Sequence, residues 1–354
     1  MNDIQIFGNK DKGQNFVKSI EKKRFLFSLV ISYTETSEIP GITIAGTNLD
    51  FIKFTPPADA EYLHYGTCKC IDSVPMTPDG KPTPALLTKV ALECASIPHI
   101  VINAGSKIIP DIPFFETGLE HGKNIQKEPA LDRYYVLRAV EHGRIIGRTL
   151  GAVTDCLVIG ESIPGGTTTA MAVLKGFDIN ANVSSSIPKN PLELKNKVVN
   201  DALKRSKSKD AYDVIANVGD PMIPVVAGML STASQTSKVL LAGGTQMAAV
   251  LALGHSTGFD ENNIAIGTTS YIVNDNSANF LDTIKEIADI PILSIDPKLD
   301  DSKIHGLKSY SDGFVKEGAG AGGAMISAIL KTGITSEKLL EKTEEEYQRV
   351  ITSQ

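Results

Sequence analysis

Short apolar runs alternate with helical patterns along most of this chain. The runs are continuous and rich in Val and Ile, which is typical of strands covered by helices on both faces. We expect strands at residues 25–32, 99–104, 155–160, 213–218, 239–242 and 264–267. Helical patterns occur at 83–95, 130–150, 167–175, 191–206, 225–237 and 245–253, and a charged helix is expected at 336–350. This alternation predicts an α/β fold with a doubly wound, Rossmann-like parallel sheet.

Composition narrows the class of protein. Hydrophobic residues make up 42% of the 354 residues, enough for a sizeable core, and the length suggests two domains. The formal net charge of −6 argues against a nucleic-acid partner, because phosphate binding needs a surplus of Lys and Arg. Neither a leader peptide nor a membrane span is evident, and four cysteines make no disulfide scaffold, so we expect a cytoplasmic protein.

The segment 155–174, DCLVIGESIPGGTTTAMAVL, is the most informative stretch. A buried strand is followed by a glycine-bearing loop and by threonines that open a helix, an arrangement that favours phosphate binding at a helix N-terminus. The candidate phosphate ligands are Gly160, Gly165, Gly166, Thr167 and Thr168. The alternative is an ordinary strand–loop–helix connection with Thr167 as the N-cap. Glu161 beside this loop would face ribose hydroxyls or a cationic ring, or else be a solvated loop residue.

A second glycine-rich stretch covers residues 314–330, FVKEGAGAGGAMISAIL. Gly318, Gly320 and Gly323 match G-x-G-x-x-G, but the stretch lies too near the C-terminus for a dinucleotide-binding unit. A helix of small residues packed closely against a neighbour is the simpler interpretation. Glu317, held by a constrained backbone near a dry pocket, could have a raised pKa and act as a general base.

Further small and hydroxyl residues follow the other predicted strands. Because the carboxyl ends of parallel strands share one edge, we expect a single ligand crevice there. Its other candidate residues are Gly219, Asp220, Gly243, Gly244, Thr245, Thr268 and Thr269.

These motifs resemble the nicotinate-nucleotide–dimethylbenzimidazole phosphoribosyltransferase family, and its archaeal branch most closely. Residues 160–168 resemble the family's G-E-x-x-x-x-x-T-T element, and 317–320 its G-E-G-x-G element, with Lys316 in place of the first glycine. Residues 218–220 resemble a G-G-x-E stretch. Residues 241–244 resemble V-V-L-D-G-F, with Ala242 at the aspartate and Gly244 at the phenylalanine. Residues 40–48 and 55–66 resemble the archaeal branch alone.

The resemblance implies a reaction and an assembly. The family moves 5-phosphoribose from nicotinate mononucleotide to a benzimidazole-like base, giving an α-riboside phosphate for the cobalamin lower loop, with no metal or other cofactor. It implies that Glu317 is the general base and that Glu161 steadies the ribose. It also implies a homodimer, and a smaller, mostly helical domain (1–90 with 330–354) beside a catalytic domain (91–329).

Three other interpretations remain open. The same fold could act on another nucleotide or base, such as a purine, which the loss of the aspartate at Ala242 motivates. The chain could also be a non-catalytic nucleotide-binding module, or, less in keeping with its motifs, a dinucleotide-dependent oxidoreductase. The H-x3-C-x-C pattern of His64, Cys68 and Cys70 lacks a fourth ligand, so we expect no zinc site.

Overall fold

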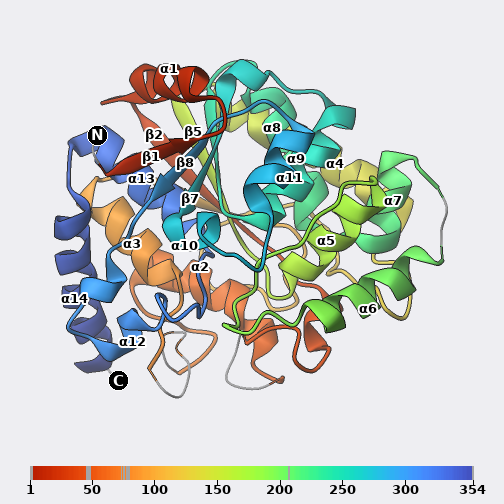
Figure 1. Cartoon of the computed structure of the whole chain (residues 1–354), viewed down its shortest axis with the longest axis horizontal. Helices are drawn as coiled ribbons and strands as arrows, with labels where there is room; N and C mark the ends of the chain where they lie inside the picture. Colours follow the sequence, from red (N-terminus) through yellow and green to blue (C-terminus); the bar gives the residue numbers. More distant parts are fainter. Residues whose placement is uncertain are drawn as a thin grey trace.

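The protein is built on one mixed sheet of eight strands, in the order β1-β8-β7-β6-β5-β2-β3-β4 (Figure 1). The computed structural model describes residues 3–44, 49–72, 74, 76, 80–205 and 208–352. Its strands are β1 (Ile4–Phe7), β2 (Phe25–Ile31), β3 (His99–Asn103), β4 (Phe115–Glu116), β5 (Cys156–Ser162), β6 (Lys238–Ala242), β7 (Ile264–Thr269) and β8 (Ile292–Ile295). All neighbours pair in parallel except β1, which runs antiparallel to β8 at one edge. The predicted α/β fold is confirmed.

Five predicted strands are confirmed as β2, β3, β5, β6 and β7. The strand predicted at 213–218 is wrong, because these residues belong to the helix α7 (Ala211–Val218). The Asp210 carboxylate accepts hydrogen bonds from the backbone N–H groups of Tyr212 and Asp213, which caps the helix. Val214, Ile215 and Val218 then share one buried face at helical spacing, a pattern that a short apolar run does not distinguish from a strand.

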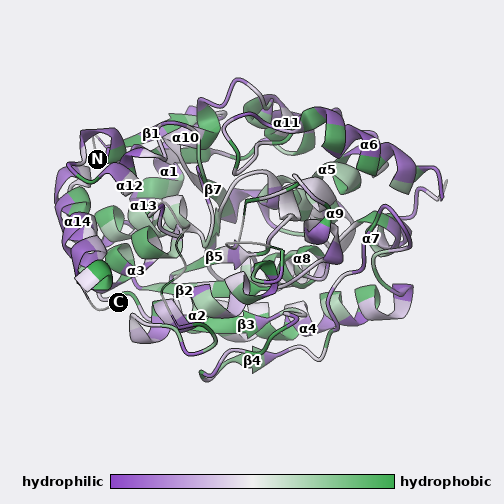
Figure 2. Ribbon diagram, turned by 90° about the horizontal axis from the view of Figure 1, so that it is seen from below, coloured by the Kyte–Doolittle hydropathy of each residue, from purple (hydrophilic) through white to green (hydrophobic). Residues whose placement is uncertain are grey.

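Helices cover both faces of the sheet, which explains why its central strands are mostly apolar. On β5, Leu157 and Ile159 point into one core, and Cys156 and Val158 into the other. The first core is closed by α4 (Arg133–Gly151), α5 (Gly166–Gly176), α6 (Leu192–Leu203), α7, α8 (Met222–Ala233), α9 (Thr245–Thr257) and α11 (Phe280–Ile287). The second is closed by α1 (Lys10–Ile20), α2 (Thr55–Tyr65), α3 (Ala85–Cys94), α13 (Ala321–Thr332) and α14 (Ser336–Thr352). Hydrophilic residues line the outer helices α6 and α14 (Figure 2).

All the predicted helices correspond to helices of the structure, and the predicted end at residue 206 lies outside the described residues. The proline-rich segment 34–89 contains α2, which begins with Pro56 and Pro57 in its first turn, where a missing N–H does no harm. Residues 45–48 of the archaeal-branch resemblance also lie outside the described residues. Across the part of the chain that is described, no helix has both the length and the apolar character needed to cross a membrane.

The predicted division into residues 1–90 with 330–354 and residues 91–329 stays a prediction. Strands β1 and β2 of the first segment pair with β8, β3 and β5 of the second, so both segments contribute to the one sheet. The C-terminal helix α14 packs against α3, which places the end of the chain beside the N-terminal region.

Candidate active site

A cavity of about 320 Å³ opens at the carboxyl ends of the central strands. One wall follows β5 and the start of α5, and a second is formed by residues 184–186 and the turn before α9. The loop before α13 and the proline-rich N-terminal segment close the remaining sides. The cavity therefore lies where open parallel sheets bind their ligands.

The structure brings half of the predicted site residues to the cavity wall. These are Glu161, Gly165, Gly166, Thr167, Gly244, Thr245, Glu317 and Gly318. The others are not among the residues that line the cavity: Gly160, Thr168, Gly219, Asp220, Gly243, Thr268, Thr269 and Gly320. Several of these position the lining residues, as described below, so that they support the site without facing it.

Glu317 is held by backbone amides on two sides. Its Oε2 accepts a hydrogen bond from the Thr269 N–H at 2.9 Å, and its Oε1 lies 3.2 Å from the backbone nitrogens of Gly318 and Gly322. The Thr268 hydroxyl lies 3.4 Å from Oε2. Burial raises the pKa of Glu317 to about 7, and these hydrogen bonds limit the rise because they favour the ionised form. A carboxylate with that pKa can accept a proton near neutral pH.

The glycine-rich helix α13 explains how Thr268 and Thr269 come so close to Glu317. A Cβ atom at Gly322 would lie 2.3 Å from the carbonyl carbon of Thr268, and one at Gly323 would lie 2.3 Å from the Cβ of Ala242. The helix therefore packs directly on the ends of β7 and β6. This confirms the interpretation of the stretch as a small-residue helix. It also shows that Ala242 faces α13 and not the cavity.

Glu161 lies at the end of β5 and is buried in the same cavity. Burial, followed by the nearby charges of Asp220 and Glu317, raises its pKa to about 8. Asp220 lies behind it, where its carboxylate accepts from the Thr169 hydroxyl at 2.5 Å and from the first backbone N–H groups of α8. Asp220 thus caps α8 and adds negative charge beside the cavity.

Asp59 on α2 is a third carboxylate of the cavity wall, and sequence reasoning missed it. Its two oxygens accept hydrogen bonds from the hydroxyls of Thr83 and Ser162, both at 2.7 Å. Burial raises its pKa to about 6. With Glu161 and Glu317, it gives the cavity wall a group of buried carboxyl groups whose pKa values are all raised by burial.

Lys195 on α6 lies behind the cavity wall, in contact with the lining residues Thr167 and Ser184, and it too was missed. Its Nζ donates to the Thr167 hydroxyl at 3.1 Å and to the Ser184 carbonyl oxygen at 2.8 Å. The side chain is fully buried, which lowers its pKa to about 7. One signal was available in the sequence, because Lys195 lies on the apolar face of its helix together with Val198, Val199 and Ala202.

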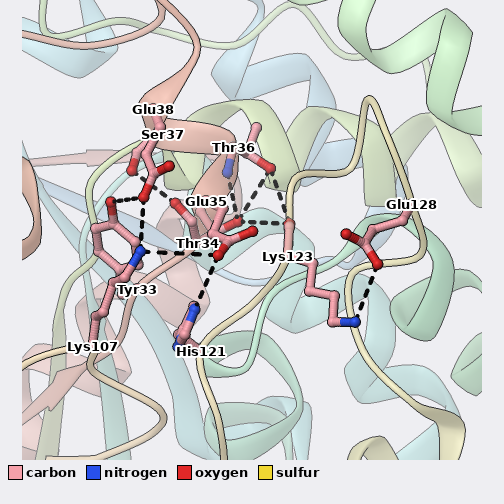
Figure 3. A network of polar contacts seen from close by, with 10 residues as sticks. All are labelled: Tyr33, Thr34, Glu35, Thr36, Ser37, Glu38, Lys107, His121, Lys123 and Glu128. Atoms are coloured by element: carbon pink, nitrogen blue, oxygen red, sulfur yellow. Dashed lines mark hydrogen bonds and ion pairs between the residues drawn. The ribbon is translucent and has the colours of Figure 1, made fainter. Parts of the chain in front are cut away.

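Gly165 has to be glycine for two reasons. Its φ of +75° lies in the left-handed region, and a Cβ atom there would lie 2.9 Å from the Cα of Ser37. Figure 3 shows how the segment around Ser37 is fixed: Glu38 accepts from the Tyr33 hydroxyl at 2.8 Å and pairs with Lys107 at 3.0 Å. The glycine-bearing loop after β5 therefore packs against a hydrogen-bonded part of the N-terminal segment.

The remaining predicted residues have plain structural positions. Gly160 packs against Gly320, since a Cβ atom on Gly160 would lie 2.9 Å from the Cα of Gly320. The Thr168 hydroxyl is buried without a hydrogen-bond partner among the described residues. Gly219 and Gly243 occupy the turns that follow α7 and β6. In the described part of the chain, no group of three or more His, Cys, Asp or Glu side chains is arranged to hold a metal ion.

Comparisons with known proteins agree with this geometry. The UPF0284 protein of Archaeoglobus fulgidus is 47% identical over 96% of this chain and 98% of its own length. Those of Sulfurisphaera tokodaii and Sulfolobus acidocaldarius are 46% and 43% identical over 94% and 95% of this chain, and 96% and 100% of theirs. The chain belongs to the UPF0284 family. The model of a phosphoribosyltransferase family also matches residues 91–260 of this chain.

A solved structure shares the fold of this UPF0284 protein. It is the nicotinate-nucleotide–dimethylbenzimidazole phosphoribosyltransferase of Thermus thermophilus, with a TM-score of 0.61 over 91% of this chain and 84% of that one. A second structure, of CobT from the same organism, gives a TM-score of 0.58 over 91% and 85%. Sequence identity is 16% in both cases, so these two matches establish the fold alone. The family resemblance predicted from the motifs is confirmed.

Proposed function

We propose that this protein transfers 5-phosphoribose from nicotinate mononucleotide to a nitrogen of a benzimidazole-like base, giving an α-riboside phosphate. The observation that supports the proposal is that the buried Glu317 carboxylate lines the same cavity as the loop of glycines and threonines that opens α5. One side of the cavity would bind an anion, and the other side carries Glu317, which can accept a proton. Transfer of phosphoribose to the N–H group of a base requires both.

The donor phosphate would lie at the N-terminus of α5. The amides of Gly166 and Thr167 begin this helix, and the helix dipole favours an anion there. Lys195 adds a buried cation behind the Thr167 hydroxyl, and a phosphate dianion would raise its lowered pKa and keep it charged. The ring of the donor is a pyridinium cation, which would be attracted to the acidic part of the cavity around Glu161.

The chemical step would need a base and no metal. The acceptor nitrogen forms a bond to C1 of the ribose, while the bond from C1 to the pyridinium nitrogen breaks and returns its electron pair to the ring. The proton of the acceptor N–H passes to Glu317. Since the leaving group departs as neutral pyridine nitrogen, no Lewis acid is required. Glu161, when ionised, would stabilise the positive charge that develops on the ribose.

The decisive experiment measures turnover. The protein is incubated with nicotinate mononucleotide and 5,6-dimethylbenzimidazole, and release of nicotinate and of the riboside phosphate is followed by chromatography. Release that is lost in Glu317→Gln, with nucleotide binding retained, supports the proposal. If wild type and variant both bind nucleotide but neither turns over any of a panel of bases, the chain is a binding module.

Asp59 favours a second candidate, an acceptor base that carries an amino group. Thr83, which donates to Asp59, is followed by Pro84, and Pro84 lies 3.0 Å from the position of a Cβ atom at Gly318. Asp59 and Glu317 therefore border the same part of the cavity. A buried carboxylate beside the acceptor would accept a hydrogen bond from an amino group, as an aminopurine could donate, whereas the methyl groups of dimethylbenzimidazole offer no donor. Relative kcat/KM values for the two bases discriminate between these acceptors.

We also propose a homodimer. The helix α4 exposes Tyr134, Leu137 and Ile145, which are 65%, 42% and 59% accessible and leave apolar area for a second copy to cover. Light scattering coupled to size-exclusion chromatography measures the mass directly, and a monomer at micromolar concentration would exclude a stable dimer. The cytoplasmic location stays a prediction.

A further inference from the structure

Glu317 lies in a segment whose backbone is unusually constrained. Val315, Lys316 and Ala319 have φ values of 63°, 61° and 48°, in the left-handed region that favours glycine. A β-branched residue such as Val315 is a genuine outlier there, and such conformations persist only where the surroundings enforce them. Lys316 also stands where the family motif has a glycine, the residue that adopts this left-handed conformation most readily.

The Lys316 side chain is one of the groups that hold this segment. Its Nζ lies 2.8 Å from Oδ2 of Asp275, and the two side chains are only 8% and 6% exposed. The Lys316 carbonyl oxygen accepts from the Thr269 hydroxyl at 2.7 Å, next to the Thr269 N–H that binds Glu317. Because a buried charge without its partner is costly, the pair fixes where residue 316 can lie.

Asp275 connects this pair to the phosphate-binding side of the cavity. The same Oδ2 accepts from the Ser184 hydroxyl at 2.6 Å, and Ser184 lines the cavity. The Ser184 carbonyl oxygen in turn accepts from Lys195, which donates to Thr167 at the start of α5. A second link joins the same two loops, because the Val315 N–H donates to the Ser186 carbonyl oxygen at 2.9 Å.

We propose that Lys316 is a positioning residue that couples the proton acceptor to the phosphate-binding loop. Through Asp275 and Ser184, its ammonium group connects the loop that carries Glu317 to the wall that would hold the donor phosphate. The loop and the wall therefore form a single unit. The inference rests on the proposed function for the identity of the nucleotide. It goes further in assigning a role to a residue that touches neither substrate nor reacting atoms.

The test compares variants of Lys316 by two independent readouts. Calorimetry gives the Kd of nicotinate mononucleotide, and turnover with dimethylbenzimidazole gives kcat. Lys316→Met should weaken nucleotide binding and lower kcat, each by about tenfold, as expected for the loss of a coupled contact. Lys316→Arg keeps the charge and should recover most of both. Asp275→Asn should match Lys316→Met, and the double variant should be no worse than either single one.

Lys298 offers a matched control. It too has a left-handed backbone, with φ 56°, and it pairs with Glu337, but it lies outside the cavity wall. Lys298→Met should leave both readouts unchanged. Should Lys316→Met fail to fold, Lys316→Gly removes the charge while relieving the backbone, and the same losses are expected.

If the wild type binds the nucleotide, two results would overturn the inference. One is a fall in melting temperature with kcat and Kd of the folded protein unchanged, which would make the pair merely structural. The other is a fall in kcat with an unchanged Kd, which would break the link to the phosphate side. If the wild type binds the nucleotide but turns over no base, the proposed reaction is wrong. The Kd values of wild type and Lys316→Met then still show whether Lys316 affects the nucleotide-binding side of the cavity. Absence of nucleotide binding by the wild type would overturn both.

Discussion

Replacing Glu317 by glutamine tests the burial argument through protein stability. Glu317→Gln keeps the size of the side chain but exchanges one acceptor oxygen for an NH2 group. One carboxylate oxygen accepts from the Thr269 amide, and the other from the amides of Gly318 and Gly322. Whichever way the new amide turns, a donor faces a donor. A buried N–H left without an acceptor costs about 1–3 kcal/mol.

This loss should be offset as the pH rises. Burial raises the pKa of Glu317 from 4.5 to about 7, so the folded protein holds a proton that the unfolded chain releases. The stability that this proton contributes is complete below pH 4.5 and is lost as the pH rises to about 7. At full ionisation the interval corresponds to about 3 kcal/mol. Glutamine does not titrate, so the variant should gain about 2–3 kcal/mol relative to wild type between about pH 5 and pH 8.

Urea unfolding of both proteins at the two pH values measures this difference directly, provided that their m-values agree. Glu337→Gln is the control, because Glu337 is exposed and Lys298 lowers its pKa. The stability of this variant relative to wild type should not rise between the two pH values. In the same preparations, loss of the general base should reduce kcat by about 10²–10⁴-fold. A Glu317→Gln difference that stays flat across this pH range would refute the raised pKa, and an unchanged kcat would refute the role as base.

Three further substitutions test other parts of the site. Lys195→Met should weaken nucleotide binding about 10–100-fold, and binding to wild type above pH 7 should take up a proton, both measured by calorimetry in buffers of different ionisation enthalpy. An unchanged affinity would exclude the lysine from the phosphate site. Gly322→Ala should lower stability by about 1–3 kcal/mol and also kcat, because its Cβ would displace Thr268. Gly254→Ala, where the Cβ would approach side-chain atoms of Phe259 and Leu230 and no backbone, should cost less by thermal unfolding. Asp59→Asn should change the kcat/KM ratio of an aminopurine to dimethylbenzimidazole while nucleotide affinity stays constant; a constant ratio would remove Asp59 from the acceptor side.

The central strands could be predicted from the sequence because each is a continuous apolar run that both cores require. Shorter strands could not. β8 (Ile292–Ile295) is brief and follows Pro291, and β1 (Ile4–Phe7) contains an exposed Gln5, so neither resembles a buried central strand. The helix at 211–218 was mistaken for a strand because the six-residue pattern is ambiguous, although Asp210 offered a capping signal.

The site divides along the same physical line. Glu317, and the glycines and threonines that follow β5, could be predicted as candidates because the residues next to them in the sequence form recognisable motifs. Lys195 and Asp59 were missed because each comes from a separate helix, α6 or α2, through packing that local patterns do not contain: Asp59 lines the cavity, and Lys195 contacts the lining residue Thr167. The pairing of Lys316 with Asp275 is likewise a product of tertiary structure, since the two residues lie on different loops.

The pairing of β1 with β8 has a consequence for how the chain folds. Ile4 pairs with Ile295, so the edge strand β1 pairs with a strand that follows far later in the sequence. During synthesis the first strand has no partner until most of the chain has left the ribosome, and contacts of such long sequence separation form slowly. A chain that stops short of β8 would leave the edge of β7 uncovered and an unpaired β1 strand beside it. Exposed strand edges are prone to pair with other molecules, and we therefore expect incomplete chains of this protein to aggregate before they fold.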